Sequence, residues 1–284
     1  MWWLLGLLII LLAAWGAASA RHVLYPPRVP ISPLVPLPPS TCHALTAPDG
    51  VPFNVWVFEP SAPPRARLLL YHGYFANRNQ VLGLADGLRL RGYEVVLPEL
   101  RGHGERPGPC TLGIREMEEA GVLLAWGRRR DHVRPLPIGV VGFSMGAAVA
   151  CQIAARYPEI RAVVADSIYS RFFPMLQRAI WHRYHLPPVP WVWVTWWALQ
   201  VALGRRLRRL DPASLAPQLH QPLLAIQGGE DRRVVPMLGR EFYRRWAGPK
   251  ERWFEPTVAH VQMFATHPQE YRDRVASFFD RTLT

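Results

Sequence analysis

The chain has 284 residues, half of them apolar, which is enough to bury one large hydrophobic core or two small ones. Its formal net charge is +12, and the excess is arginine, because Lys250 is the only lysine. The arginines are scattered, with short runs at 128–130 and 205–209, whereas nucleic-acid binders concentrate basic residues on one face or tail. We therefore expect no nucleic-acid partner, and attribute the charge to genome composition or to attraction toward anionic lipid.

The first element in chain order is an apolar segment, residues 2–20, which contains no charged side chain. As a helix it would span about 28 Å, close to the hydrocarbon core of a bilayer at ~30 Å. No Lys or Arg precedes it, which favours an uncleaved anchor over a signal peptide cleaved near Ala20. Arg21 and Arg28 follow it and favour the cytoplasmic side for the main domain, with export after cleavage as the alternative.

A proline-rich linker follows at residues 21–40, with seven prolines. Proline is excluded from helix interiors and central strands, and runs of it favour the extended polyproline form. We expect a stiff stalk that lifts the rest of the chain, residues 41–284, off the membrane.

From residue 54 onward, short apolar runs alternate with helical patterns. Strands are expected at 54–60, 66–73, 93–99, 138–142, 161–166, 222–228 and 251–255, and helices at 79–91, 111–129 and 268–283. Continuous apolar runs are typical of strands that are buried on both faces. The alternation predicts an α/β domain with a mostly parallel, doubly wound sheet, in which ligands bind at the carboxyl ends of the strands.

The sequence "VVGFSMGAAVA" places Ser144 directly between one of these strands and a helix. Gly142 and Gly146 flank it and allow a turn so tight that the serine side chain points out over the sheet edge. The backbone N–H of Met145 then lies at the helix N-terminus, where it can donate to a developing oxyanion. The pattern favours a nucleophilic serine over a strand–turn–helix unit without chemistry.

A serine nucleophile needs a base, and the base needs an orienting acid. With this type of elbow the chain order is Ser, acid, His, so the base is expected near the C-terminus. We predict His260 as the base, with His267 and a solvated loop role as the alternatives. Asp231, which follows the 222–228 strand, is the predicted acid, and Glu230, Asp166 and a plain turn role compete with it.

A second oxyanion donor is expected from the loop after the 66–73 strand, in "YHGYFANR". Gly73 permits close approach of the backbone, and the N–H of Tyr74 is the predicted donor. His72 in this loop and His103 in "RGHG" are expected to be structural.

An inserted cap is predicted at residues 167–221, because a crossover helix with its loops needs only about half of those 55 residues. Its nine aromatics include four predicted substrate-binding residues, Trp191, Trp193, Trp196 and Trp197. We expect a lid that binds acyl chains or enters the membrane, with the arginines of 205–209 near lipid phosphates. A helix whose tryptophans pack on the core and a second transmembrane span are the alternatives.

The segments "YHGYFANR", "ELRGHGERPG", "TLGIREMEEA", "GFSMG", "IQGGEDRRVVP" and "AHVQMFATHPQEY" resemble the α/β-hydrolase superfamily, in particular its serine aminopeptidase-like or lysophospholipase-like branch. The resemblance implies the α/β-hydrolase fold with Ser144 as nucleophile, Asp231 as acid and His260 as base. It also implies Tyr74 and Met145 as oxyanion donors.

Two departures from the family pattern concern the acid and the histidine loop. Arg232 and Arg233 both stand between Asp231 and the "VVP" triplet, where the family usually has one residue. We still predict Asp231 as the acid, because the distance from the end of the strand determines where its side chain can reach. Val261 follows the histidine, where a glycine is common.

These residues together predict a membrane-associated serine hydrolase that cleaves carboxylic esters or thioesters, with lipophilic acyl substrates and neither metal nor organic cofactor. A serine peptidase or amidase of the same fold and an inactive, ligand-binding relative are the alternatives. The three cysteines form no zinc or disulfide pattern. Cys42 and Cys110 could pair in an exported protein, and Cys151 is expected to be a small buried apolar residue.

Overall fold

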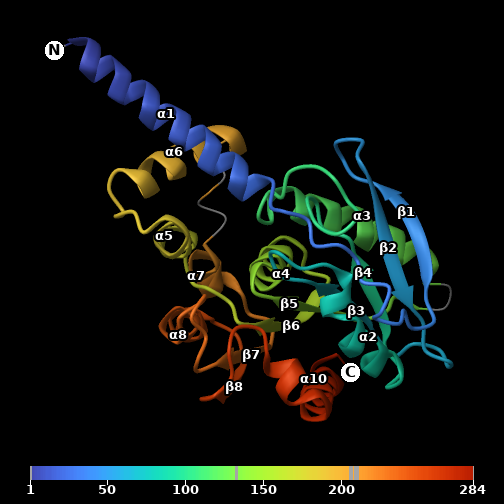
Figure 1. Ribbon diagram of the computed structural model, residues 1–284. Coiled ribbons are helices and arrows are strands. Elements are labelled where there is room, and N and C mark those ends of the chain that lie inside the picture. The colour runs from blue at the N-terminus through green and yellow to red at the C-terminus, as the bar shows by residue number, and fades with distance from the viewer. Residues whose placement is uncertain (1, 132–133, 205–206, 208–210, 284) are drawn as a thin grey trace.

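The computed structural model describes residues 2–131, 134–204, 207 and 211–283. Within these ranges, eight strands form one sheet in the order β1-β2-β4-β3-β5-β6-β7-β8 (Figure 1). They are β1 (Thr41–Thr46), β2 (Pro52–Phe58), β3 (Arg67–Tyr71), β4 (Glu94–Pro98), β5 (Ile138–Phe143), β6 (Ile160–Asp166), β7 (Leu223–Gly228) and β8 (Lys250–Glu255). The pairs from β4 to β8 are parallel, and β1 and β2 are antiparallel to their neighbours. The predicted mostly parallel sheet is confirmed.

Helices cover both faces of this sheet. The described helices are α1 (Trp2–Leu24), α2 (Leu82–Arg89), α3 (Ile114–Arg130), α4 (Met145–Arg156), α5 (Phe172–Tyr184), α6 (Trp191–Leu203), α7 (Pro212–Leu215), α8 (Pro236–Arg245), α9 (Met263–Thr266) and α10 (Pro268–Thr282). One apolar cluster joins the sheet to α3, α4 and α8, and a second joins its other face to α2 and α10. Because the sheet is buried by an apolar cluster on each face, its central strands are continuous apolar runs in the sequence.

Two details of the expected elements differ from the structure. Strand β1 was not predicted, because it is an edge strand with no fully buried residue and therefore lacks an apolar run. The helix expected from Thr111 begins at Ile114 instead. The Glu116 carboxylate accepts hydrogen bonds from the backbone N–H groups of Thr111 and Gly113, at 2.9 Å each, and holds those residues as the cap.

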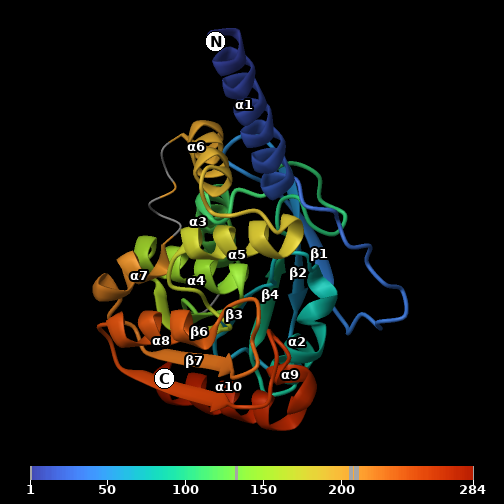
Figure 2. The ribbon, with the colours of Figure 1, turned by 60° about the vertical axis from the view of Figure 1, so that its left-hand side comes forward.

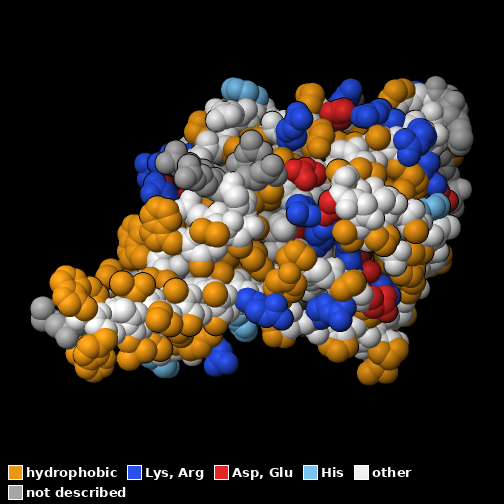
Figure 3. Space-filling view, turned by 90° about the horizontal axis from the view of Figure 1, so that it is seen from above, with side chains coloured by type: hydrophobic (Ala, Val, Ile, Leu, Met, Phe, Trp, Pro, Cys, Tyr) orange, Lys and Arg blue, Asp and Glu red, His pale blue; other side chains and the backbone are white. Residues whose placement is uncertain are grey.

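The N-terminal helix α1 runs to Leu24, four residues past the predicted end of the apolar segment. Its first half projects from the body, and its second half lies against α6 (Figures 1 and 2). Gly16 allows this close approach, since a Cβ there would lie 2.8 Å from Val194 Cγ1, and the hydroxyls of Ser19 and Thr195 are 2.7 Å apart. Hydrophobic side chains gather along the projecting arm (Figure 3). Of the described residues, only α1 forms a helix long and apolar enough to cross a membrane.

The predicted stalk is wrong, because residues 26–40 lie along the surface of the domain. The side-chain amide of Asn77 donates to the carbonyls of Val29 and Pro30, at 3.0 and 3.1 Å, and that of Asn79 donates to Ser32 at 3.1 Å. An extended proline-rich backbone has free carbonyls, which these amides satisfy.

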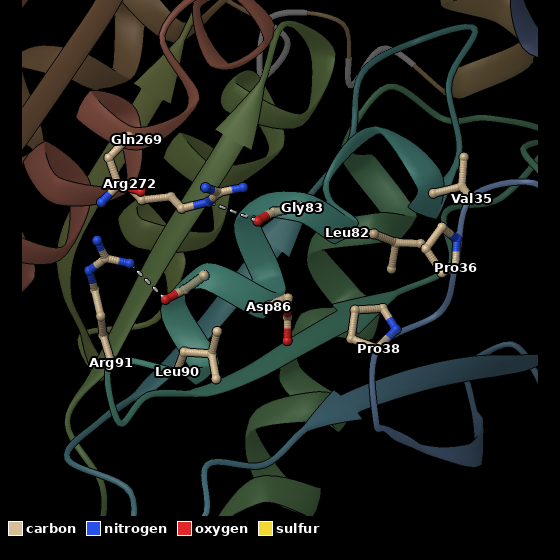
Figure 4. A pocket seen from close by; sticks show the side chains of 11 residues that line it. Val35, Pro36, Pro38, Leu82, Gly83, Asp86, Leu90, Arg91, Gln269 and Arg272 are labelled. Carbon is tan, nitrogen blue, oxygen red and sulfur yellow. Dashed lines mark hydrogen bonds between the residues drawn. The ribbon is translucent and has the colours of Figure 1, made fainter.

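Further along, this segment, α2 and α10 line a shallow cavity of about 430 Å³ (Figure 4). The domain therefore sits directly at the end of α1.

The residues between β6 and β7 form α5, α6, α7 and a short 3₁₀ turn, Ala216–Gln218, at the positions expected for the cap. Helix α5 crosses the molecule below α6 and α1 (Figure 2). The arginine run predicted at 205–209 lies outside the described residues, apart from Leu207.

The cysteines are all free thiols. Cys42 is exposed on β1, whereas Cys110 is buried with its Sγ 3.5 Å from Sδ of Met145, so the pairing considered for an exported protein is absent. Cys151 is buried in α4, as expected.

Candidate active site

Ser144 occupies a strained turn between β5 and α4. Its backbone has φ 53° and ψ −111°, which is sparsely populated for a residue with a side chain. A Cβ at Gly142 would lie 2.2 Å from the carbonyl oxygen of Gly146, and a Cβ at Gly146 would lie 2.2 Å from that of Tyr71. Both glycines are therefore sterically required, and the turn presents the Ser144 hydroxyl at the carboxyl edge of the sheet.

The structure brings the three predicted side chains into one hydrogen-bonded row. Ser144 Oγ lies 2.9 Å from His260 Nε2, and His260 Nδ1 lies 2.7 Å from Oδ2 of Asp231. Because the carboxylate accepts the Nδ1 proton, Nε2 is left free to accept a proton from the hydroxyl. The row can therefore take a proton from Ser144 and hold it on the imidazole.

Asp231 is buried and held by several donors. Its Oδ1 accepts from the backbone N–H groups of Arg233 and Val234, at 3.0 and 2.7 Å, and its Oδ2 accepts from the side-chain amide of Gln227 at 3.1 Å. These bonds fix the carboxylate toward His260. This geometry agrees with the choice of Asp231 by its distance from the end of the strand. Counting back from the "VVP" triplet would place the acid at position 232, which holds an exposed arginine.

Close backbone packing joins the acid turn to the histidine loop. A Cβ at Gly228 would lie 2.1 Å from the Val258 carbonyl oxygen, and Glu230 N donates to that same oxygen at 3.0 Å. The Glu230 side chain is exposed, whereas the buried carboxylate of Asp231 is the one bonded to His260. Val261 adopts φ 51°, the left-handed conformation that favours glycine, and its N–H donates to Ser167 Oγ at 3.1 Å.

Asp166, the other competing acid, has different partners. Its carboxylate accepts hydrogen bonds from the hydroxyls of Ser167 at 2.8 Å and Tyr271 at 3.0 Å, and none from His260. Burial raises the pKa of Asp166 to about 6. Its backbone carbonyl accepts from Ser144 N at 2.8 Å, so Asp166 supports the elbow through its main chain.

The two predicted oxyanion donors, Tyr74 and Met145, line the same cavity as Ser144. Within the described ranges, the backbone N–H groups of Tyr74 and Met145 make no hydrogen bond, so both can donate to a ligand. Gly73 N donates to the side-chain oxygen of Gln80 at 2.7 Å and thereby holds the loop beside the elbow.

The histidines expected to be structural have that role. His72 Nδ1 donates to the Gly73 carbonyl at 2.9 Å, and His103 Nδ1 donates to the Arg101 carbonyl at 2.7 Å. Burial lowers the pKa of His72 to about 3 and also lowers that of His103, so both rings are neutral at pH 7. His267 is the N-cap of α10, as expected for a helix-start residue.

A cavity of about 750 Å³ lies over Ser144, between the sheet edge, α1 and α5. Much of its wall is apolar, and the largest share comes from one face of α5 at helical spacing, Phe172, Met175, Leu176, Ala179 and Ile180. Helix α1 contributes Ser19, His22 and Val23. Sequence reasoning missed both contributions, although the α5 spacing was visible in the sequence. The contribution of α1 was not visible in the sequence, because only tertiary packing brings that helix to the site.

None of the four tryptophans predicted to bind substrate, Trp191, Trp193, Trp196 and Trp197, is among the described residues that line the cavity. Trp191 packs edge-on against Trp15, with ring centroids 5.1 Å apart, and Trp196 packs on Phe173 at 5.3 Å. Trp193 also packs on Phe173, with ring centroids 5.0 Å apart, but it is 48% exposed, and Trp197 is 62% exposed. Helix α6 is apolar all round, so sequence could not show which of its faces meets the site.

Comparison with known proteins identifies the fold. Residues 66–191 match a family model described as alpha/beta hydrolase fold. An esterase of Pyrococcus furiosus superposes with a TM-score of 0.76 at 25% identity, over 92% of this chain and 99% of that one. An uncharacterized protein of Mycobacterium tuberculosis is 26% identical over 88% of this chain and 83% of its own length. A monoacylglycerol lipase of Mycolicibacterium smegmatis is 30% identical over 41% of this chain and 42% of its own. The chain therefore has the α/β-hydrolase fold, and residues 66–191 are similar to the α/β-hydrolase family.

Proposed function

We propose that the protein is a membrane-tethered serine hydrolase that cleaves carboxylic esters or thioesters with lipophilic acyl groups. The observation that carries the proposal is the row Ser144–His260–Asp231, with contacts of 2.9 and 2.7 Å, at the base of a largely apolar cavity. The esterase and lipase among the relatives described above support the same reaction class.

In the proposed reaction, His260 Nε2 takes the hydroxyl proton as Ser144 Oγ attacks the carbonyl carbon of the ester. The negative charge that forms on the carbonyl oxygen is stabilised by the backbone N–H groups of Tyr74 and Met145. The imidazolium, stabilised by Asp231, then protonates the departing alcohol or thiol and leaves an acyl-serine. Water, deprotonated by His260, releases the acid and regenerates the hydroxyl.

The tether in this proposal is α1. At 23 residues it would span about 34 Å, enough for a bilayer core, and Trp2 and Trp3 at its exposed end suit a membrane interface. The possible cleavage site lies inside the helix, with Ser19 and Ala20 buried against the rest of the protein, which supports an anchor over a signal peptide. Arg21 in the last turn of the helix and Arg28 after it favour the cytoplasmic side for the domain.

A fluorophosphonate probe tests the nucleophile, because it reacts only with an activated serine. We expect the full-length protein in detergent to be labelled at Ser144, Ser144→Ala to lose all labelling, and Ser214→Ala to label normally, since Ser214 is exposed on α7. Circular dichroism checks that each variant is folded. Folded wild-type protein that remains unlabelled would overturn the proposal and favour a ligand-binding role.

A series of p-nitrophenyl esters, from acetate to laurate, tests the lipophilic acyl group. We expect kcat/KM to rise with chain length until the apolar wall is filled, by up to about fourfold per methylene, because burying one is worth about 0.8 kcal/mol. The measurement is initial rates in a fixed detergent concentration. A maximum at acetate would contradict the assignment of the cavity to long acyl chains.

A further inference from the structure

The cavity over Ser144 has a basic side as well as an apolar wall. Helix α5 contributes Arg178 and Arg183, and the turn after Asp231 contributes Arg232 and Arg233. His22 and His182 also line this side. Among the described residues that line the cavity there is no Asp or Glu.

These four arginines differ from the arginines packed elsewhere in the domain. Arg67 pairs with Asp131 at 2.9 Å, Arg101 with Asp49 at 2.6 Å, and Arg106 with Glu119 at 2.6 Å. Within the described part of the chain, no carboxylate forms an ion pair with any of the four cavity arginines. Their positive charge is therefore left without a counterion from the protein.

Arg178 carries the most specific observation. Its Nη2 donates to the backbone carbonyl of Arg232 at 2.6 Å, which ties α5 to the acid turn and fixes the guanidinium beside the cavity. Its Nε is buried and has no hydrogen-bond partner among the residues that the structure describes. A buried, charged donor without an acceptor is costly, and an anionic ligand would satisfy it.

The position of this charge suits an amphipathic substrate. Arg232 and Arg233 directly follow Asp231, which contacts His260, so their charge lies close to the reacting groups. An acyl chain would lie along the apolar face of α5 while an anionic group on the alcohol side meets the guanidinium groups. Guanidinium binds phosphate and carboxylate in a bidentate manner, and these are the anions we consider.

We propose that the substrate is an acyl ester with a phosphate or carboxylate near the scissile bond, bound by Arg178, Arg232 and Arg233. This inference rests on the proposed hydrolase function and adds the charge of the substrate. It also gives a role to the second arginine between Asp231 and the "VVP" triplet, because both residues contribute charge to the same side of the cavity.

Three water-soluble esters with the same acyl chain test the proposal: 1-hexanoylglycerol, 1-hexanoylglycerol 3-phosphate and 3-O-hexanoylglycerate. The short chain keeps all three monomeric, so the protein in detergent meets them without a bilayer. We expect kcat/KM, measured as hexanoate release, to be at least tenfold higher for one of the anionic esters than for the neutral one. The preferred anion then identifies phosphate or carboxylate as the recognised group.

The double variant Arg232→Gln/Arg233→Gln is expected to lower this anionic-to-neutral ratio about tenfold. The matched control is Arg161→Gln/Arg240→Gln, which removes the same charge from exposed positions outside the cavity and leaves the ratio within twofold. The backbone N–H groups that hold Asp231 remain in both variants. Fluorophosphonate labelling of Ser144 reports whether each variant is folded and reactive.

A salt series on wild-type protein gives a second readout that needs no variant. Raising the ionic strength from 20 mM to 500 mM is expected to lower the anionic-to-neutral ratio at least threefold, because salt screens charge attraction. A ratio near one, or a ratio that neither salt nor the double variant changes, would overturn the proposal. Absence of labelling and of all ester hydrolysis would instead reject the proposed function.

Discussion

Asp231→Asn is expected to lower kcat for ester hydrolysis about 10³–10⁴-fold while the protein stays folded. An asparagine can turn its amide N–H toward His260 Nδ1, which then accepts and leaves the proton on Nε2. That tautomer cannot take the proton from Ser144. The buried carboxylate also stabilises the imidazolium that forms during the reaction, and the neutral amide does not. Steady-state rates with a p-nitrophenyl ester, together with a thermal melt, measure both effects.

The matched control for this variant is Asp166→Asn, at the end of the neighbouring strand. Asp166 contacts the Ser167 and Tyr271 hydroxyls, and these can reorient to pair with an amide. We therefore expect kcat within about fivefold of wild type, in keeping with a side chain that makes no contact with His260. If Asp166→Asn lost activity and Asp231→Asn kept it, the acid would have to be reassigned to Asp166.

Gly16→Leu is expected to separate α1 from α6 and to remove the α1 wall of the cavity. A Cβ at Gly16 already lies 2.8 Å from Val194 Cγ1 and 3.2 Å from the Val194 carbonyl oxygen, so a leucine cannot fit without moving one helix. Overpacking of this kind costs about 1–3 kcal/mol, and the free energy that holds the wall in place falls by that amount. We expect kcat/KM for a decanoyl ester to fall about tenfold, with a smaller loss for an acetyl ester that needs less of the wall.

Gly6→Leu is the control for this substitution, since it adds the same side chain to the same helix. A Cβ at Gly6 has no atom within 4 Å, so we expect wild-type kinetics with both esters. Each variant is compared in the same detergent, and fluorophosphonate labelling confirms that Ser144 remains reactive. Equal kinetics for Gly6→Leu and Gly16→Leu would show that α1 does not form a working wall of the site.

Helix α1, the proposed membrane anchor, also forms part of the proposed active site. Helix α1 contributes Ser19, His22 and Val23 to the cavity, and the hydroxyl of Tyr74 donates to the Val23 carbonyl at 2.7 Å. The loop that supplies one proposed oxyanion donor is therefore bonded to the helix that we propose as the anchor. In this arrangement substrate would reach Ser144 beside the membrane, between α1 and α5.

The sequence by itself determined the central sheet and the serine elbow. Strands buried on both faces must be continuous apolar runs, and β3 to β7 are such runs. The turn at Ser144 excludes any Cβ at positions 142 and 146, so its glycines are visible in the sequence. Chain order and distance from a strand end also indicated Asp231 and His260, because parallel strands bring their carboxyl ends to one edge.

Only the tertiary structure decided which surfaces meet at that edge. Hydrogen bonds that no sequence pattern encodes separate Asp231 from Asp166 and hold residues 26–40 against the domain. Helix α6 is apolar on every side, so its tryptophans could be assigned to packing or to solvent only once α1 and α5 were in place. The basic side of the cavity likewise joins α5 to the turn after β7, about fifty residues apart in the chain. Local sequence fixes local geometry, whereas contacts between distant elements depend on how those elements pack.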